Sequence, residues 1–359
     1  MFNLVITSWG RGLGGHFYDC REFADELHSR GCEFDMLEIY RHERSPVLRQ
    51  CPAYSNIAWG SGLLGFWSSL RGVAALLNNG RITICFDVEA LFLVRLCGLG
   101  DKATLFKCGG ANLPKLPRTK KLIVTNQDNY NFYRSHGRSC YDVGPVVRTL
   151  EGSDADTVRS IPRRILRIGR ISKTYSGLVP IFESLAAELN STDLDLTLEW
   201  IGVVEDEEMY SRLLRINGLC LRTTPDFTVD AARHYSKHDL AICTGRGALE
   251  AAARGARVAC FSTLAKLPVL VTQENFLSFA KVNFSLRASV AGSDTLETLI
   301  HGEQNAPWQF FNDRFDGLIG YLTSSKGSDY SRLTAWLDYL TLSLRVLIRG
   351  WREPIKHSR

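Results

Sequence analysis

The chain has 359 residues, of which 45% are hydrophobic and 23% are charged. This length and composition are typical of a soluble protein with two domains, each with its own core. The formal net charge of +5 suits anionic ligands or a membrane surface, but it is too small to indicate nucleic acid as a partner.

The sequence also argues against secretion, a membrane span and a metal site. The N-terminal MFNLVITSWG lacks the basic region of a secretory signal and indicates a buried strand. The longest apolar run, residues 61–77, is interrupted by Arg71 and Gly72, so we expect no membrane span. The ten cysteines form no CxxC pair, which favours reduced cysteines in the cytoplasm. His234 and His238 have helical spacing, but no acid completes a metalloprotease pattern.

The first part of the chain alternates between strand and helix patterns. Gly31 is expected to end the first helix, because glycine adopts the left-handed conformation that often follows a helix. In chain order, the predicted elements are a strand over 2–8, a helix over 16–31, a strand over 32–40, a helix over 63–77, a strand over 81–88, a helix over 89–100, strands over 103–110 and 120–126, a helix over 128–137 and a strand over 139–147.

A polar, turn-rich segment over 148–162 is interpreted as a linker, and a second alternating series follows it. Its predicted strands cover 163–172, 194–202, 218–224, 239–245 and 257–262, with helices between them. Alternating strands and helices predict an α/β fold with doubly wound parallel sheets. We therefore expect two Rossmann-like domains, over 1–155 and 156–325, with ligands bound at the carboxyl ends of the strands in the cleft between them.

The last segment, residues 326–359, is predicted to form a long amphipathic helix with a basic tail. Arg349, Arg352, Lys356 and Arg359 lie in this tail. Two interpretations remain open. The helix packs back on the first domain, or its last turns lie on an anionic membrane.

A first glycine turn, within residues 8–17, suggests an anion site at a helix start. Gly10, Gly12 and Gly15 fit a GxGxxG pattern, and Glu38 falls about where an acid would bind a dinucleotide ribose. The alternative is a tight strand-to-helix turn without a ligand.

Two further turns lie in the second series. Arg170 and Lys173 follow a strand and could neutralise a diphosphate, or they could be solvated surface charges. Residues 244–247, Thr-Gly-Arg-Gly, lead into a helix that is predicted to start at Ala248 and to carry Glu250 in its first turn. Glu250 could complement the helix dipole, or it could accept hydrogen bonds from a ribose.

Taken together, these motifs resemble those of retaining GT-B glycosyltransferases, specifically glycosyltransferase family 4 of the bacterial surface-polysaccharide type. The resemblance covers roughly Met1 to Asn283. It rests on Gly14-Gly15 before REFADELHSRGCEF, on Gly169-Arg170 with Lys173, and on the segments EWIGVVED, YSKHDL and EAAARGARV.

The resemblance implies roles for individual residues. Arg170 and Lys173 would hold the donor diphosphate, and Glu250 would bind the nucleotide ribose. Backbone N–H groups would support the phosphates at Gly245, Arg246, Gly247, Ala248 and Leu249. The interdomain cleft and its acceptor side would be lined by Gly14, Gly15, His16, Lys107 and Gly109. Members of the family usually have a second glutamate eight residues before the equivalent of Glu250, where this chain has Ile242.

The predicted function is a retaining, metal-independent hexosyltransferase of polysaccharide or glycolipid biosynthesis. Its donor would be a UDP- or GDP-linked sugar, its acceptor a saccharide or a lipid-linked molecule, and it would need no cofactor and no nucleic acid. We expect it in the cytoplasm, with the inner face of the membrane as a second location. Two alternatives stay open: an epimerase or NAD-dependent enzyme on a similar fold, and a non-catalytic partner subunit, which Ile242 favours.

Overall fold

The computed structural model describes residues 1–9, 14–60, 62–108, 113, 116–148, 161–292, 295–308 and 310–324. The chain divides into two compact units. Unit 1 contains Met1–Val143 together with the chain from Arg314, and unit 2 contains Gly144–Asp313. The first change of unit lies just before the predicted linker at 148–162, of which 149–160 are outside the described residues.

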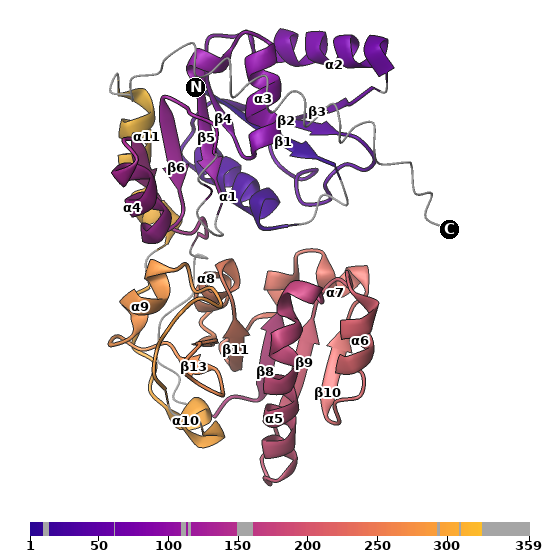
Figure 1. Ribbon diagram of the computed structural model, residues 1–359, viewed down its shortest axis with the longest axis vertical. Helices are drawn as coiled ribbons and strands as arrows, with labels where there is room; N and C mark the ends of the chain where they lie inside the picture. The colour runs from indigo at the N-terminus through magenta and orange to yellow at the C-terminus, as the bar shows by residue number, and fades with distance from the viewer. Residues whose placement is uncertain are drawn as a thin grey trace. The chain divides into compact units, whose positions relative to one another are not determined.

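Unit 1 is built on a seven-stranded parallel sheet in the order β3-β2-β1-β4-β5-β6-β7 (Figure 1). The interior strand β1 is buried along its whole length, as its apolar sequence predicts. The strands are β1 (Phe2–Ser8), β2 (Phe34–Tyr40), β3 (Tyr54–Ala58), β4 (Ile82–Cys85), β5 (Ala103–Lys107), β6 (Lys121–Val124) and β7 (Cys140–Asp142).

Helices cover both faces of this sheet. One apolar cluster joins the sheet to α2, α3 and α4, whereas Phe23 of α1 packs against Phe315 of α11 with ring centroids 5.6 Å apart. Gly31 has a φ of +64° just after α1, which confirms its predicted role in ending that helix. The helices are α1 (Gly15–Ser29), α2 (Gly62–Leu77), α3 (Val88–Leu96), the 3₁₀ turn η1 (Gly100–Lys102), α4 (Gln127–Ser135) and α11 (Phe315–Thr323).

Helix α11 belongs to unit 1 although it follows unit 2 in sequence. The sequence-based boundaries put these residues in the second domain. The side-chain ammonium of Lys121, at the start of β6, donates to the carbonyls of Tyr321, Leu322 and Ser324 at 2.8, 2.6 and 2.5 Å. The Tyr321 hydroxyl also donates to the Ser139 carbonyl at 2.9 Å. Side chains about 200 residues apart therefore fix the last described helix to the first sheet.

Unit 2 has a six-stranded sheet in the order β10-β9-β8-β11-β12-β13. Its strands are parallel except β13, which runs antiparallel to β12. The strands are β8 (Arg164–Ile168), β9 (Thr197–Ile201), β10 (Leu219–Arg222), β11 (Asp239–Cys243), β12 (Arg257–Cys260) and β13 (Val269–Leu270).

Two apolar clusters cover the two faces of this sheet. One joins it to α5, α6 and α10, and the other joins it to α8 and α9. Figure 1 shows α5 lying along β8 and β9. The helical segments are η2 (Lys173–Leu178), α5 (Val179–Asn190), α6 (Glu207–Leu213), α7 (Pro225–Thr228), η3 (Ala231–His234), α8 (Arg246–Ala252), α9 (Phe276–Lys281), α10 (Leu296–His301) and η4 (Phe311–Arg314).

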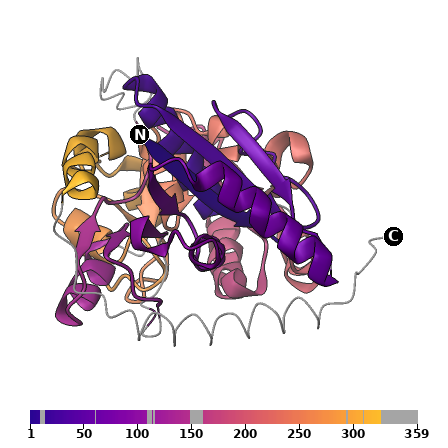
Figure 2. The same ribbon diagram turned by 90° about the horizontal axis from the view of Figure 1, so that it is seen from above.

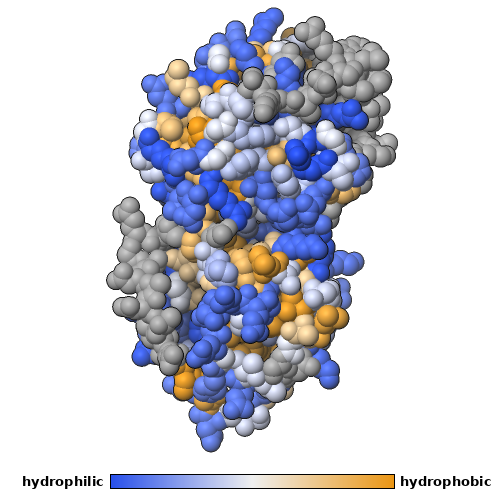
Figure 3. All heavy atoms as spheres, turned by 90° about the vertical axis from the view of Figure 1, so that its left-hand side faces the viewer, coloured by the Kyte–Doolittle hydropathy of each residue, from blue (hydrophilic) through white to orange (hydrophobic). Residues whose placement is uncertain are grey.

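This architecture confirms the prediction of two Rossmann-like parallel-sheet domains. The predicted C-terminal helix over 326–359 lies outside the described residues. Within the described ranges, no helix is both long enough and apolar enough to cross a membrane. Figure 3 shows hydrophilic side chains over much of one face, with hydrophobic ones gathered over part of unit 2.

We expect Lys121→Met to loosen α11, because three carbonyl groups at the end of this helix lose their charged donor. Hydrogen bonds to charged groups contribute about 1–3 kcal/mol each at most, so the loss is a measurable part of the local stability. Hydrogen exchange followed by mass spectrometry should show faster exchange in Phe315–Thr323. Lys102→Met, which removes an exposed lysine of the same unit, should leave that exchange unchanged. Equal exchange in both variants would refute a structural role for Lys121.

Candidate functional site

Each sheet has a point where the chain reverses the direction in which it adds strands. In unit 2 this topological switch point lies between β8 and β11, and in unit 1 it lies between β1 and β4. In open α/β sheets, ligands bind at the carboxyl ends of the strands beside such a point. A ligand of unit 2 is therefore expected beside the turns that follow β8 and β11.

The turn after β11 is short and conformationally unusual. Only Thr244 and Gly245 separate β11 from α8, and Gly245 has a φ of +59°. Its N–H donates to the carbonyl of Phe284 at 2.8 Å. Asn283 and Phe284 also have positive φ angles, 54° and 51°, which are rare for a bulky side chain. Strained backbone of this kind often lies at functional sites, where surrounding contacts maintain it.

Helix α8 starts at Arg246, two residues before the predicted start. The prediction that Glu250 lies in the first turn is therefore wrong, because Glu250 is the fifth residue of the helix. The Nε of Arg246 donates to Oε1 of Glu250 at 2.5 Å, and its Nη1 donates to the Val146 carbonyl. Both side chains are mostly buried, with 14% and 15% exposed. Glu250 thus orients Arg246 at the switch point instead of complementing the helix dipole.

The turn after β8 is held close to β9. The indole of Trp200 donates to the Gly169 carbonyl at 2.8 Å, and the Gly169 N–H donates to the Ile201 carbonyl at 3.0 Å. A methyl group on Gly202 would lie 2.0 Å from the Gly169 oxygen, so only glycine fits there. A methyl group on Gly247 would lie 4.0 Å from the Ile168 oxygen, which places the start of α8 beside the end of β8. Backbone without side chains therefore borders the β8–β11 switch point.

The two predicted diphosphate cations are exposed. Arg170 follows Gly169 and forms an ion pair with Glu205 at 3.2 Å, on the β9 side of β8. Lys173 is the first residue of η2. Glu250 lies on the β11 side, so the structure brings these residues to the same edge of the sheet and gives Arg170 and Glu250 different ion-pair partners. Arg170 and Glu250 therefore do not form an ion pair with each other.

Position 242 lies inside the sheet. Ile242 is completely buried in β11 and packs in the cluster that joins the sheet to α5. Because β11 leads into α8 through two residues, the position eight residues before Glu250 is in the core in this chain. Isoleucine at this position is therefore explained by packing.

The acceptor-side residues of the sequence analysis lie at the carboxyl edge of unit 1. Gly14 precedes α1, and Gly15 and His16 are its first two residues. Lys107 ends β5 and is buried. The thiol of the next residue, Cys108, donates to the Phe86 carbonyl at 3.8 Å. Gly109 lies outside the described residues.

Glu38 is engaged within the fold. It is fully buried in β2, where its Oε1 accepts from the Ser45 N–H at 2.7 Å and its Oε2 accepts from the Tyr54 hydroxyl. Both carboxylate oxygens therefore have protein partners. This arrangement explains Glu38 without a ribose and removes the acid on which the dinucleotide interpretation depended.

Sequence reasoning did not identify Asp87, which lies at the switch point of unit 1. Its carboxylate accepts from the Thr7 N–H at 2.7 Å, the Thr7 hydroxyl at 3.0 Å and the Ala90 N–H at 2.6 Å, and so caps α3. Burial of the carboxylate, with a contribution from Glu89, raises the pKa of Asp87 to about 7, although its hydrogen bonds act in the opposite direction. An aspartate near the end of the strand predicted over 81–88 was the available sequence signal.

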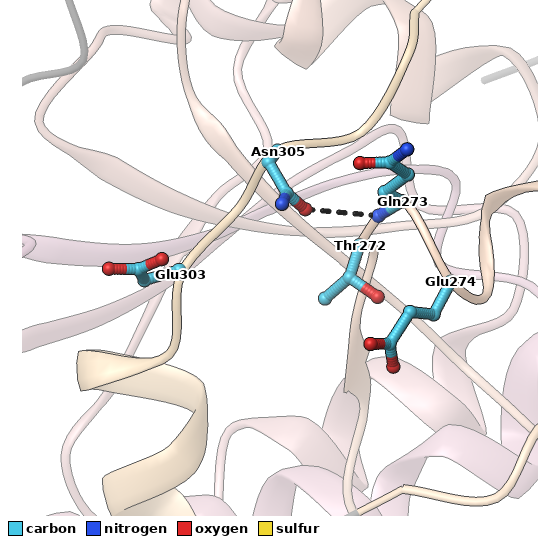
Figure 4. Close-up of a pocket in the computed structure, with 5 residues that line it drawn as sticks. All are labelled: Thr272, Gln273, Glu274, Glu303 and Asn305. Atoms are coloured by element: carbon cyan, nitrogen blue, oxygen red, sulfur yellow. Dashed lines mark hydrogen bonds between the residues drawn. The ribbon is translucent and has the colours of Figure 1, made fainter.

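A separate cavity of about 650 Å³ lies elsewhere in unit 2. Figure 4 shows its lining, in which the Gln273 N–H donates to the Asn305 side chain at 3.1 Å. Because β13 is antiparallel, the residues after it lie at the amino ends of the parallel strands, opposite the switch point. The lining contains two carboxylates and no cation, which does not suit a diphosphate. Its residues are Thr272, Gln273, Glu274, Glu303 and Asn305.

The sequence matches no protein-family model and no curated protein. Solved structures match it over nearly its whole length. The Anabaena protein HepE in complex with UDP and glucose has a TM-score of 0.53 at 13% identity, covering 97% of this chain and 98% of that chain. The chain has the GT-B fold.

Two further structures of this fold belong to proteins that are named for different activities. A Listeria monocytogenes protein assigned as a UDP-N-acetylglucosamine 2-epimerase has a TM-score of 0.55 at 12% identity, covering 92% of this chain and 99% of that chain. The lipopolysaccharide outer core galactosyltransferase WaaB has a TM-score of 0.50 at 13% identity, covering 97% of this chain and 100% of that chain. At such low identities, the likeness establishes the fold alone.

We expect Asp87 to make the thermal unfolding of unit 1 pH-dependent near neutrality. The folded state keeps the Asp87 proton up to about pH 7, whereas an unfolded chain loses it near pH 4. Its contribution to stability is therefore complete below about pH 4 and is lost as the pH rises through 7. The midpoint of thermal unfolding should fall less between pH 4 and pH 8 in Asp87→Asn than in the wild type. Asp193→Asn, at an exposed site, should keep the wild-type slope, and an unchanged slope in Asp87→Asn would contradict the shifted pKa.

Proposed function

We propose that the protein is a glycosyltransferase that uses a nucleotide-diphosphate sugar, with a UDP- or GDP-linked hexose as donor. The arrangement at the β8–β11 switch point carries this proposal. Two exposed cations, Arg170 and Lys173, follow one strand, and a glycine turn follows the other. Cations and open backbone N–H groups at the carboxyl edge of a parallel sheet suit a diphosphate. The likeness to HepE, solved with UDP and glucose, supports the same donor class.

In the proposed reaction, the acceptor hydroxyl attacks the anomeric carbon on the face that the diphosphate leaves. A carbon–oxygen bond to the acceptor forms, the bond to the donor diphosphate breaks, and the hydroxyl proton passes to the leaving group. Retention of configuration follows from attack on that same face. Arg170 and Lys173 would stabilise the charge that develops on the diphosphate, which is often the largest contribution to such catalysis. This chemistry would require neither a metal nor a cofactor.

Glu250 has a revised place in this proposal. Its Oε1 already binds Arg246, so its second carboxylate oxygen would bind the ribose while Arg246 stays oriented. Within residues 245–249, the N–H groups of Gly245 and Ala248 already donate to the carbonyls of Phe284 and Gly245, so those of Arg246 and Gly247 would support the phosphates. At the carboxyl edge of unit 1, Gly14, Gly15, His16 and Lys107 would lie on the acceptor side. The family resemblance implies the same role for Gly109, which is outside the described residues.

An epimerase that acts on a nucleotide sugar is the second candidate, because the Listeria monocytogenes protein gives a TM-score of 0.55. Both activities would use the same donor site, so nucleotide binding alone does not separate them. The two activities are separated by incubation with UDP-glucose, UDP-N-acetylglucosamine and the GDP-linked sugars, followed by NMR of the products. A transferase releases UDP or GDP and forms a glycoside with the donor configuration. Accumulation of a 2-epimer without a glycoside would refute the transferase proposal.

We expect Arg170→Ala to weaken UDP or GDP binding by roughly 10- to 100-fold, because a charged hydrogen bond contributes about 1.5–3 kcal/mol. Its loss should hardly affect stability, since exposed ion pairs such as Arg170–Glu205 contribute little. Glu250→Gln keeps an acceptor for Arg246 and should weaken nucleotide binding without unfolding α8. Isothermal calorimetry measures both effects. Arg212→Ala, at an exposed site on α6, is the matched control, and nucleotide affinities equal to that control in both variants would remove the site assignment.

The acceptor is proposed to be lipid-linked and reached from a membrane surface. Membrane contact is one of the two interpretations of the basic C-terminal tail, which lies outside the described residues. Helix α2 offers a second surface. It exposes Leu64 by 88%, Trp67 by 59% and Leu76 by 44%, together with Arg71, and residues 62–77 contain no acid. Figure 2 looks down on this helix. Exposed tryptophan and leucine with a basic residue suit an anionic lipid surface.

The double variant Leu64→Glu/Trp67→Glu should bind vesicles that contain phosphatidylglycerol at least about tenfold more weakly, because each apolar side chain that enters lipid contributes about 1.5–3 kcal/mol. Sedimentation with vesicles measures this. Leu214→Glu/Leu264→Glu, two exposed leucines of unit 2, forms the matched control. Truncation after Gly350 tests the tail separately. Undiminished vesicle binding in both the α2 variant and the truncated chain would exclude the membrane proposal.

A further inference from the structure

A buried arginine lies directly under the β8–β11 switch point. Arg167 is the fourth residue of β8 and has no exposed surface. Its guanidinium carbon lies 5.2 Å from the ring centroid of Tyr175, 4.7 Å from that of Trp200 and 5.3 Å from that of Phe261. Three aromatic rings therefore enclose a positive charge in the core of unit 2.

This charge lacks the partners that buried arginines normally have. Its closest hydrogen-bond contact is from Nη1 to the Ile242 carbonyl at 3.5 Å, and its Nε and Nη2 have no partner among the residues that the structure describes. Arg164, on the same strand, instead binds Asp239 at 2.8 Å and Glu199 at 2.9 Å. Burial lowers the pKa of Arg167. An unpaired buried charge is costly, so its presence indicates an anion that the protein itself does not supply.

The anion would reach Arg167 from the glycine turn. A methyl group on Gly169 would lie 3.1 Å from Nη2 of Arg167, so the guanidinium lies against the backbone of residue 169 in the turn at the carboxyl edge of the sheet. Trp200 joins the two features, since its ring lies over Arg167 and its N–H holds the Gly169 carbonyl. Ser172, in the same turn, has a buried hydroxyl without a partner in the described part of the chain.

We propose that Arg167 is a positioning residue for a diphosphate, a buried counter-charge that attracts this group to the Gly169 turn from beneath. The inference rests on the proposed function for the identity of the ligand, but its chemistry is that of the diphosphate alone. Arg170 and Lys173 are exposed and are screened by water and salt, whereas Arg167 acts through a medium of low dielectric constant. When the ligand binds, its negative charge compensates the positive charge of the unpaired guanidinium.

Arg167→Met tests the proposal, because methionine fills the aromatic enclosure without a charge. Calorimetry with UDP, inorganic pyrophosphate and uridine should show UDP and pyrophosphate affinities lowered by roughly 10- to 100-fold, with uridine affinity unchanged. Arg167→Lys, which keeps the charge, should restore much of the affinity. Without ligand, Arg167→Met should unfold at or above the wild-type temperature, because buried charges are often replaced by apolar groups at no cost. Arg212→Met, on α6, controls for loss of an exposed arginine.

The outcomes separate this inference from the proposed function. If the wild type binds UDP and Arg167→Met binds UDP and pyrophosphate equally well, the inference is overturned and the function stands. If the wild type binds pyrophosphate but neither UDP nor GDP, and Arg167→Met loses pyrophosphate, the function is overturned and the inference stands. A wild type that binds none of these ligands overturns both. Should Arg167→Met fail to fold, Arg167→Lys decides: pyrophosphate binding near the wild-type level supports the role of the charge, and its complete loss opposes it.

Discussion

The close approach of two backbone segments determines the geometry of unit 2. Gly169 and Gly202 lie so near one another that no side chain fits between them, and the indole of Trp200 fixes the contact through the Gly169 carbonyl. This contact holds the turn after β8 against β9. On the β11 side of β8, the start of α8 lies beside the end of the strand. Three features of the donor site lie around it: Arg170 pairs with Glu205, Gly247 lies beside Ile168, and the guanidinium of Arg167 lies against Gly169.

The charges around this turn fall into two classes with different physical behaviour. Arg170 and Lys173 are in water, where their attraction for an anion is weakened by salt and by their own hydration. Arg167 and the Arg246–Glu250 pair are buried or mostly buried, so their effects are stronger and their geometry is fixed by packing. A site that combines both classes can attract an anion from solution and then hold it in one orientation.

The sequence predicts much of the fold, because apolar periodicity and glycine positions are local signals. The order of most strands and helices follows from such signals, as does the end of α1 at Gly31, whereas β3 and β13 have no counterpart among the predicted strands. Three further features do not follow from such signals. Helix α8 begins early because Gly245 turns the chain within one residue, which spacing alone does not reveal. The membership of α11 in unit 1 depends on contacts with Lys121 and Ser139, far away in sequence. The isolation of Arg167 is visible only once its neighbours are known, although an arginine between apolar residues in RILRI was a signal that could have been followed.

The return of the chain to unit 1 has a consequence for biosynthesis. In sequence, unit 2 comes between the two segments of unit 1. A ribosome therefore completes the second sheet before it makes Phe315 and the rest of α11. Until then, the apolar surface around Phe23 lacks the ring that covers it in the finished protein. The nascent chain therefore carries an incomplete first unit while the second is able to fold, and this interval is when aggregation or chaperone binding would compete with correct folding.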